Sequence, residues 1–401
     1  MISLLRVVPL MVIMPSICCG TDWLRFRGSE NDARSSSSSL PTHWDAETNV
    51  AWKAELPGRG PSSPIVVGDH VYVTCSSGAS DERLHVLCFA VDTGEEVWHR
   101  QFWATGRTFG HPTTANAAPT PASDGERIVA FFSSNDLVCL DLQGNLGWYR
   151  GLAHDWPKAG NDVGMSSSPI IVDNVAIVQV QNQGDSFGAG IDLQDGTTRW
   201  RVPLARTASW SSPTLAPGKA RPVVIFQSGE GLLACNAATG AERWRYEASC
   251  DDITSPFSSG GRLYIASDGM TALTPSQGNG SPDVAWGANQ LNPGAATPVA
   301  ADDRLFVVNG AGVLTCASTA EGKILWRKRL SGSFWASPVL AGQHLFLVND
   351  SGTTHVVDIT AEGTVVSENQ LDGRFQATPA VAGDALYLRS EHALWKIASQ
   401  R

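Results

Sequence analysis

The residues of this chain best suited to binding chemistry stand just before a short step that ends in proline and recurs eight times, seven times as Ser/Thr/Ala-x-Pro. They include two tryptophans, an arginine, an aspartate, an asparagine and a glutamine. Apolar side chains with a few polar groups are typical of ligand and partner sites. We therefore expect a recognition surface where the eight steps meet, made of Arg59, Asn116, Trp210, Asp252, Trp335 and Gln376. A solvated rim without a ligand is the alternative interpretation of these positions.

Further candidate residues lie in the longest stretches between the steps. Residues 102–117 and 151–164 are inserts rich in aromatic and polar side chains, and residues 181–186 form a further polar loop. Long inserts on one face of a repeat protein tend to build binding surfaces. We expect these segments to form a polar-aromatic ridge made of Arg107, His111, Trp156, Asn161, Asp162, Gln181 and Asp185.

The sequence lacks the common signatures of catalysis and metal binding. It contains no His-Glu-x-x-His or Cys-x-x-Cys, and its nine histidines are scattered. Its one Gly-x-Ser-x-Gly, at residues 184–188, lies in a loop between two expected strands and not on the strand-to-helix turn of a nucleophile elbow. Residues 105–110 read Thr-Gly-Arg-Thr-Phe-Gly and lack the Gly-Lys-Ser/Thr ending of a phosphate loop. We expect no catalytic residue and no metal site.

The eight prolines that end the steps set the period of the chain. They lie 40 to 57 residues apart, and each leads into an apolar strand. They are Pro64, Pro121, Pro169, Pro213, Pro256, Pro298, Pro338 and Pro379. Repeats of this length with mainly strand content indicate an all-β fold, the β-propeller, with one four-stranded antiparallel blade per repeat. A tryptophan recurs on the expected outer strands, where its ring can fill the gap between blades: Trp52, Trp98, Trp148, Trp200, Trp244, Trp286 and Trp326.

The two ends of the repeat region complement each other. The last repeat, residues 378–397, holds only three strands, while residues 49–56 form an outer strand that has Trp52 but no blade of its own. We predict that this N-terminal strand completes the last blade and closes a ring of eight blades. A ring of seven blades is the alternative, and it would leave one step unused.

Composition limits the classes of partner. The chain has 401 residues, a formal net charge of −10 and no run of about 20 apolar residues that would span a membrane. Nucleic-acid binding requires basic patches, so the charge argues against it. Repeats accumulate length within one domain, so we expect residues 48–401 to form a single, monomeric propeller.

Residues 1–20 have the pattern of a signal peptide. Arg6 precedes a short apolar run at 7–14, and Cys18 and Gly20 are small residues suited to a cut before Thr21. We therefore expect an exported protein, periplasmic or secreted. A lipid anchor on Cys19 is the less favoured alternative, because the residues ahead of it make a poor lipobox.

Residues 21–47 should form an N-terminal segment ahead of the propeller. The serine run at 35–39 indicates a linker. Trp23 and Phe26 are expected to pack under the propeller, and a partner-docking peptide is the alternative.

Six cysteines would remain after cleavage. Cys88, Cys139, Cys235 and Cys316 occupy equivalent positions in different blades, too far apart for disulfide geometry. We expect buried thiols, and only Cys75 with Cys88, on neighbouring strands of one blade, leaves a disulfide open.

The repeated pattern Ala/Cys-x-Asp-x-x-x-Gly-x-x-x-Trp, behind a signal peptide, resembles the pyrroloquinoline-quinone (PQQ)-like propeller family. The resemblance covers about 350 residues. Residues 23–28, 56–64 and 183–187 further resemble a group of exported members. The family includes PQQ-dependent alcohol dehydrogenases and cofactor-free members such as BamB, a periplasmic scaffold of outer-membrane protein assembly. The resemblance therefore implies a fold and leaves activity open.

The dehydrogenases of this family differ from the chain in several features. They are longer and carry a vicinal disulfide, a calcium site and a catalytic aspartate, whereas the only adjacent cysteines here are Cys18 and Cys19. Three arginines could pair with the carboxylates of PQQ, but no motif in the sequence assigns them this role: Arg59, Arg107 and Arg206. We therefore expect an exported, non-catalytic propeller without a cofactor that binds a protein or another component of the cell envelope. The alternatives are a PQQ- and calcium-dependent oxidoreductase with a degenerate site, and a carbohydrate-binding propeller that uses the tryptophans of the funnel.

Overall fold

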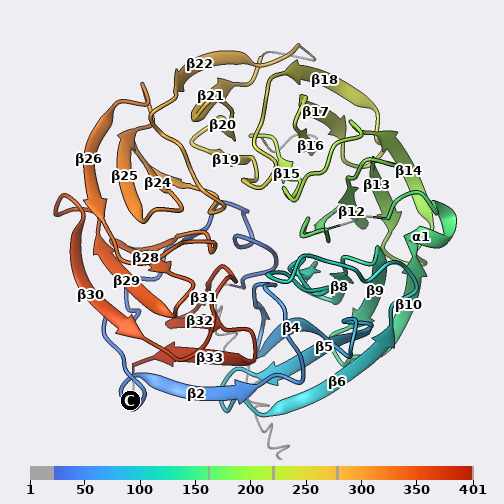
Figure 1. Ribbon diagram of the computed structural model, residues 1–401, viewed down its shortest axis with the longest axis horizontal. Helices are drawn as coiled ribbons and strands as arrows, with labels where there is room; N and C mark the ends of the chain where they lie inside the picture. The colour runs from blue at the N-terminus through green and yellow to red at the C-terminus, as the bar shows by residue number, and fades with distance from the viewer. Residues whose placement is uncertain (1–21, 161–162, 219–221, 277–279, 400–401) are drawn as a thin grey trace, which may run out of the picture.

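The computed structural model describes residues 22–160, 163–218, 222–276 and 280–399. These residues form eight blades of four antiparallel strands each, arranged as a propeller around one axis (Figure 1), and one blade carries a fifth, parallel strand. The prediction of an all-β, eight-bladed ring is confirmed. In the described chain the only helix is α1 (Leu152–Asp155), and a membrane-crossing helix is not found there.

Blades 1 to 7 use four strands that are consecutive in the chain. Those of blades 1 to 4 are β3 (Ile65–Val67), β4 (His70–Ser77), β5 (Arg83–Ala90), β6 (Glu96–Trp103); β7 (Ala122–Ser123), β8 (Arg127–Phe131), β9 (Asp136–Asp141), β10 (Leu146–Gly151); β11 (Ile170–Val172), β12 (Val175–Val180), β13 (Phe187–Asp192), β14 (Thr198–Pro203); and β15 (Thr214–Leu215), β16 (Val223–Ser228), β17 (Gly231–Asn236), β18 (Glu242–Glu247). Those of blades 5 to 7 are β19 (Phe257–Ser259), β20 (Arg262–Ala266), β21 (Met270–Thr274), β22 (Asp283–Ala288); β23 (Val299–Ala301), β24 (Arg304–Val308), β25 (Val313–Ser318), β26 (Ile324–Arg329); and β27 (Val339–Ala341), β28 (His344–Val348), β29 (Thr353–Asp358), β30 (Thr364–Gln370).

The eighth blade joins the two ends of the chain. Its strands β31 (Ala380–Ala382), β32 (Ala385–Arg389) and β33 (Ala393–Ala398) are completed by β2 (Val50–Glu55) from the N-terminal side. Strand β2 pairs antiparallel with β33, with Lys53 opposite Trp395. The predicted closure of the ring is therefore confirmed.

Each repeated proline directly precedes the innermost strand of its blade. Proline has no backbone N–H to donate, so it suits the start of a strand at the edge of a sheet. The innermost strand is such an edge, and the eight prolines thereby place eight short loops around the axis of the ring.

The tryptophans of the outer strands join neighbouring blades. Five of them are buried and donate their indole N–H to a backbone carbonyl of the next blade, at 2.8 to 3.0 Å: Trp52 to Val91, Trp98 to Leu142, Trp148 to Leu193, Trp200 to Ala237 and Trp286 to Thr319. Trp244 and Trp326 are half-buried. The expected role at blade interfaces thus holds, with a hydrogen bond added to the packing.

A glycine turn of the next blade lies against several of these rings. Gly196 has φ +75°, and a Cβ added there would lie 2.7 Å from the Trp148 ring. Gly261 has φ +79°, but a Cβ there would meet nothing within 4 Å. The two glycines therefore share the backbone strain that alanine would bring and differ in the ring contact.

We expect Gly261→Ala to lower the free energy of unfolding by about 1 kcal/mol, because alanine is strained in the left-handed region. Gly196→Ala should cost about 3 kcal/mol, since it adds overpacking against Trp148 to the same strain. Urea denaturation of the two variants and the parent measures both values. Equal losses would show that the ring contact contributes nothing.

The six cysteines of the described chain are buried and free. Cys75 stands opposite His85, and Cys88 stands opposite Tyr72, so the register of β4 and β5 keeps the two thiols apart. The possible Cys75–Cys88 disulfide is therefore not formed. Burial raises the pKa of both thiols to about 12, so they remain protonated and unreactive at neutral pH.

The N-terminal segment crosses the ring on one face and touches most blades. Trp23 is buried and forms a β-bridge with Val66 of blade 1. Asn31 donates to Thr214 of blade 4 at 2.9 Å. Strand β1 (Arg34–Ser35) pairs in parallel with β27 of blade 7. The aromatic residues thus pack under the propeller, and the start of the serine run is a strand attached to blade 7 instead of a free linker.

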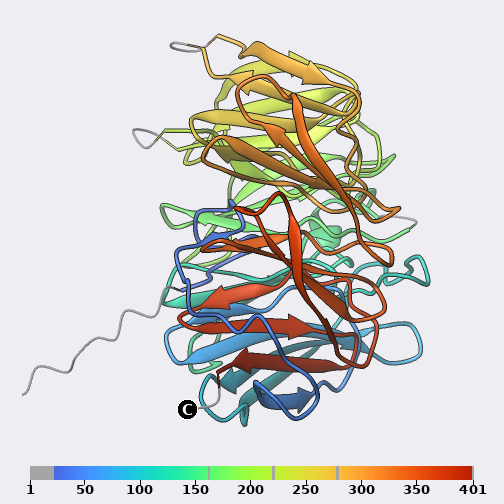
Figure 2. The same cartoon turned by 90° about the vertical axis from the view of Figure 1, so that its left-hand side faces the viewer.

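Figure 2 shows the ring edge-on and separates its two faces. The N-terminal segment, in blue, lies on the left-hand side, whereas the insert that contains α1 projects on the right-hand side. The predicted binding inserts therefore lie opposite the segment that crosses the ring.

Candidate functional site

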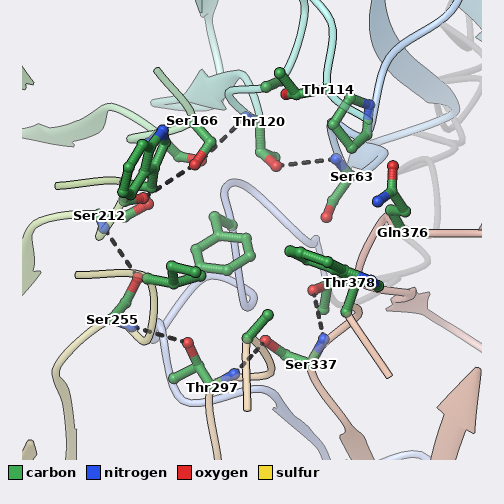
Figure 3. A pocket seen from close by; sticks show the side chains of 18 of the residues that line it. Ser63, Thr114, Thr120, Ser166, Ser212, Ser255, Thr297, Ser337, Gln376 and Thr378 are labelled. Atoms are coloured by element: carbon green, nitrogen blue, oxygen red, sulfur yellow. Dashed lines mark hydrogen bonds between the residues drawn. The ribbon is translucent and has the colours of Figure 1, made fainter. Parts of the chain in front are cut away.

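A funnel of about 410 Å³ lies on the axis of the ring. Its wall is built by the loops that lead into the innermost strands, so every blade contributes to it (Figure 3). Short side chains line its depth, and larger apolar ones line its mouth. The size lies within the range of about 300–1,000 Å³ that is common for small-ligand sites.

A ring of serine and threonine residues surrounds the axis at the depth of the funnel. The residue before each repeated proline is Ser or Thr: Ser63, Thr120, Ser168, Ser212, Ser255, Thr297, Ser337 and Thr378. The backbone N–H of each of the first seven donates to the hydroxyl of the next at 2.9 to 3.1 Å (Figure 3). We call these eight residues the hydroxyl ring. It links successive blades at the axis, as the tryptophans do at the periphery.

The floor of the funnel comes from the N-terminal segment. Phe26 lines the cavity, and the next residue, Arg27, is buried between blades 5 and 6. Its guanidinium donates to the carbonyls of Thr297 and Pro298 at 2.9 and 2.7 Å and lies 5.0 Å from the centre of the Phe257 ring. Burial lowers the pKa of Arg27 to about 9, so it is still charged at neutral pH. Arg27 therefore fixes the floor to the wall.

Four of the predicted site residues line the funnel: His111, Trp210, Trp335 and Gln376. Trp335 is 41% exposed, and Trp210 donates its indole N–H to the carbonyl of Gly164 at 2.9 Å. The backbone N–H of His111 donates to the carbonyl of Val163 at 3.1 Å. The inserts 102–117 and 151–164 therefore meet at the mouth of the funnel.

Three other residues expected at the funnel have different surroundings. Arg59 forms an ion pair with Asp81 at 2.7 Å. Asn116 is buried, where it donates to the Asp81 carbonyl and accepts from the Ser134 N–H, so it organises the loop. Asp252 is exposed and does not line the funnel. Partial desolvation of its carboxyl group and the nearby charge of Asp251 raise its pKa.

The predicted ridge residues are distributed over two places. Trp156 packs on Phe187, with ring centres 4.6 Å apart. The guanidinium of Arg201 lies 5.2 Å from the centre of the Trp156 ring. This places Trp156 against the outer strand β14, away from the axis. Arg107 lines a second, polar cavity of about 460 Å³ together with Lys158.

Residues 181–186 lie against the second insert. Gln181 is buried and donates to the Ala205 carbonyl, while the Asp185 N–H donates to the Lys158 carbonyl at 3.0 Å. Asn161 and Asp162 lie outside the described residues. The inserts are thus joined to one another and to the blades by their backbones.

Charge is missing from the funnel lining. Among the residues that the structure describes there, none is Arg, Lys, Asp or Glu. Groups of three or more His, Cys, Asp or Glu that could hold a metal ion are also not found within the described ranges. PQQ carries three carboxylates, which would have to be desolvated here without a charged partner. The described lining therefore does not fit this cofactor.

Comparison with known proteins shows the family to which the chain belongs. The family model described as "Outer membrane protein assembly factor BamB" matches residues 36–189, 189–286 and 271–390. BamB of Shewanella oneidensis is 28% identical over 187 residues, which cover 42% of this chain and 45% of that protein. The chain covers 45–51% of the curated relatives that it matches, about half their length.

Solved structures agree on the fold. BamB from Moraxella catarrhalis superposes with a TM-score of 0.66 at 17% identity and covers 88% of this chain and 98% of that one. A europium-containing methanol dehydrogenase has a TM-score of 0.63 at 13% identity and covers 93% and 90%. At these identities the likeness extends to the fold alone. The family match spans most of the repeat region, and the chain therefore belongs to the BamB family of PQQ-like β-propellers.

Proposed function

We propose that this chain is an exported, non-catalytic propeller that binds a protein of the cell envelope. The observation that carries the proposal is a set of exposed apolar side chains at the mouth of the funnel, here called the rim: Phe109, which stands two residues before the lining residue His111, and Val163, Ile253 and Trp335 of the lining itself. Their exposed fractions are 64, 37, 40 and 41%. Exposed apolar side chains gathered around a concavity are typical of interaction sites. The signal-peptide pattern at 1–20 and the BamB relatives support the envelope as the location.

The alternative, a PQQ-dependent oxidoreductase, has weaker support. The uncharged lining does not offer partners for the carboxylates of PQQ. After residue 20 the sequence has no adjacent cysteines for the vicinal disulfide of such enzymes and no stretch that matches their calcium ligands. Calorimetric titration of PQQ with Ca²⁺ into the purified chain is therefore expected to give no binding heat. Tight one-to-one binding would overturn the non-catalytic assignment.

The docking surface is tested by photo-crosslinking in the producing cell. A photoreactive phenylalanine analogue at Phe109 is expected to give one discrete adduct with an envelope protein, identified by mass spectrometry. The same analogue at Leu146, which is 53% exposed on the outer strand β10, is the control and should not give this adduct.

The substitution Phe109→Ser should then lower capture of that protein at least tenfold, because an exposed aromatic anchor contributes more than about 1.4 kcal/mol at an interface. Its circular dichroism and melting temperature should match the parent. An adduct of equal yield at both positions, or undiminished capture by Phe109→Ser, would contradict docking at the rim.

A further inference from the structure

The hydroxyl ring has hydrogen-bond capacity that the folded chain does not use. Seven of the eight hydroxyls accept one backbone N–H each. Within the described structure, none of the eight donates its own hydrogen to a protein group. All eight residues are more than nine-tenths buried and line the cavity. A hydroxyl supplies one donor and two acceptor sites, so each can still donate one hydrogen bond to a ligand or to water.

Two larger polar groups at the mouth are also available. The side-chain amide of Gln376 and the indole N–H of Trp335 make no hydrogen bond with any other described residue. Both line the funnel, and Figure 3 shows Gln376 where the hydroxyl ring is open between Thr378 and Ser63. An amide both donates and accepts, so the mouth adds groups of either kind to the donors below.

The lining selects against charged ligands. No charged side chain is present among its described residues, and the buried Arg27 and Arg389 lie outside it and donate to the carbonyls of Thr297, Pro298 and Ser62. A carboxylate, phosphate or ammonium group would lose its hydration here without gaining an opposite charge. The ligand that fits is therefore neutral, and it must carry many hydrogen-bonding groups together with apolar faces.

We propose that the funnel binds a neutral saccharide, with one pyranose unit held between the hydroxyl ring and the tryptophans. Sugar hydroxyls donate and accept, so they can match the ring and Gln376 in one orientation. The C–H faces of a pyranose can pack on the indoles of Trp210 and Trp335, which lie on blades 4 and 7, and the cavity of about 410 Å³ lies in the range of small-ligand sites. A neutral apolar peptide suits the indoles as well but offers fewer hydroxyl-like partners to the ring. This inference goes beyond protein docking at the rim.

Isothermal titration of the purified chain with maltose, cellobiose and N,N′-diacetylchitobiose tests the proposal. We expect one-to-one binding of at least one of them with a dissociation constant below 10 mM. Trp335→Ala and Gln376→Leu should each weaken it at least tenfold. Neither residue belongs to the hydroxyl ring, so the blades stay joined. The control Trp103→Ala, an exposed tryptophan on the outer strand β6, should bind like the parent.

Two results would overturn the proposal. One is the absence of binding by all three sugars. The other is binding that Trp335→Ala and Gln376→Leu leave unchanged. An N-acetylated, C-amidated Leu-Phe-Leu peptide is titrated in parallel, and binding of this peptide without any sugar would also refute the saccharide assignment. The experiment uses the chain alone, so its failure leaves the docking of a protein at Phe109 untouched.

Discussion

Replacing Trp52 with alanine is expected to lower the free energy of unfolding by about 3–5 kcal/mol, the usual cost of deleting a buried tryptophan. Trp52 lies on β2, the strand that closes the ring. Its indole N–H donates to the Val91 carbonyl of blade 1 at 2.8 Å, and its ring lies against Gly94 of that blade and 6.1 Å from the Tyr387 ring centre. One side chain thus joins the eighth blade to the first.

Urea denaturation gives the loss, and Trp103→Ala is the matched control. Trp103 is also on an outer strand but is 58% exposed, and its described ring contact is Arg83 at 5.6 Å. An exposed cation–π contact contributes about 0.5–1 kcal/mol, so this variant should lose no more than that. Hydrogen exchange of Trp52→Ala should show the loss of protection first in β2 and β33. Equal destabilisation by the two variants would show that closure does not depend on Trp52.

The repeat made the architecture predictable because each blade needs the same few residues. A proline precedes the inner strand of every blade, and seven of the eight blades have an outer tryptophan, all but the blade that holds β30. The ring closure also followed from strand counting, since β2 had a tryptophan and no blade. Export, the signal peptide and the domain boundaries remain predictions.

The candidate site was only partly predictable, because its contacts cross between blades and inserts. Arg59 is paired with Asp81, and Trp156 lies on Phe187. Neither contact repeats, so neither has a period in the sequence. The hydroxyl ring, in contrast, had a signal: Ser or Thr precedes all eight prolines. It uses the residue directly before each repeated proline, whereas the predicted binding residues stand further ahead in the chain.

The N-terminal segment was predicted to pack under the ring, but the role of its arginine was not. Arg27→Ala is expected to lower the free energy of unfolding by about 3 kcal/mol, because charge-assisted hydrogen bonds contribute about 1.5–3 kcal/mol each. Arg27 makes two of them, to Thr297 and Pro298. The cost of burying the guanidinium, seen in its pKa of about 9, offsets part of this gain.

Arg27→Met separates the two contributions, since it keeps most of the volume and removes the charge together with its desolvation cost. It should therefore lose less stability than Arg27→Ala. Arg34→Ala is the control, because its ion pair with Asp302 at 3.9 Å is largely exposed and should contribute less than about 1 kcal/mol. A loss in Arg27→Ala as small as in Arg34→Ala would show that the segment lies against the ring without stabilising it. If Arg27→Ala loses more stability than Arg34→Ala and is cleaved faster near Phe26, the guanidinium of Arg27 holds the floor of the funnel in place.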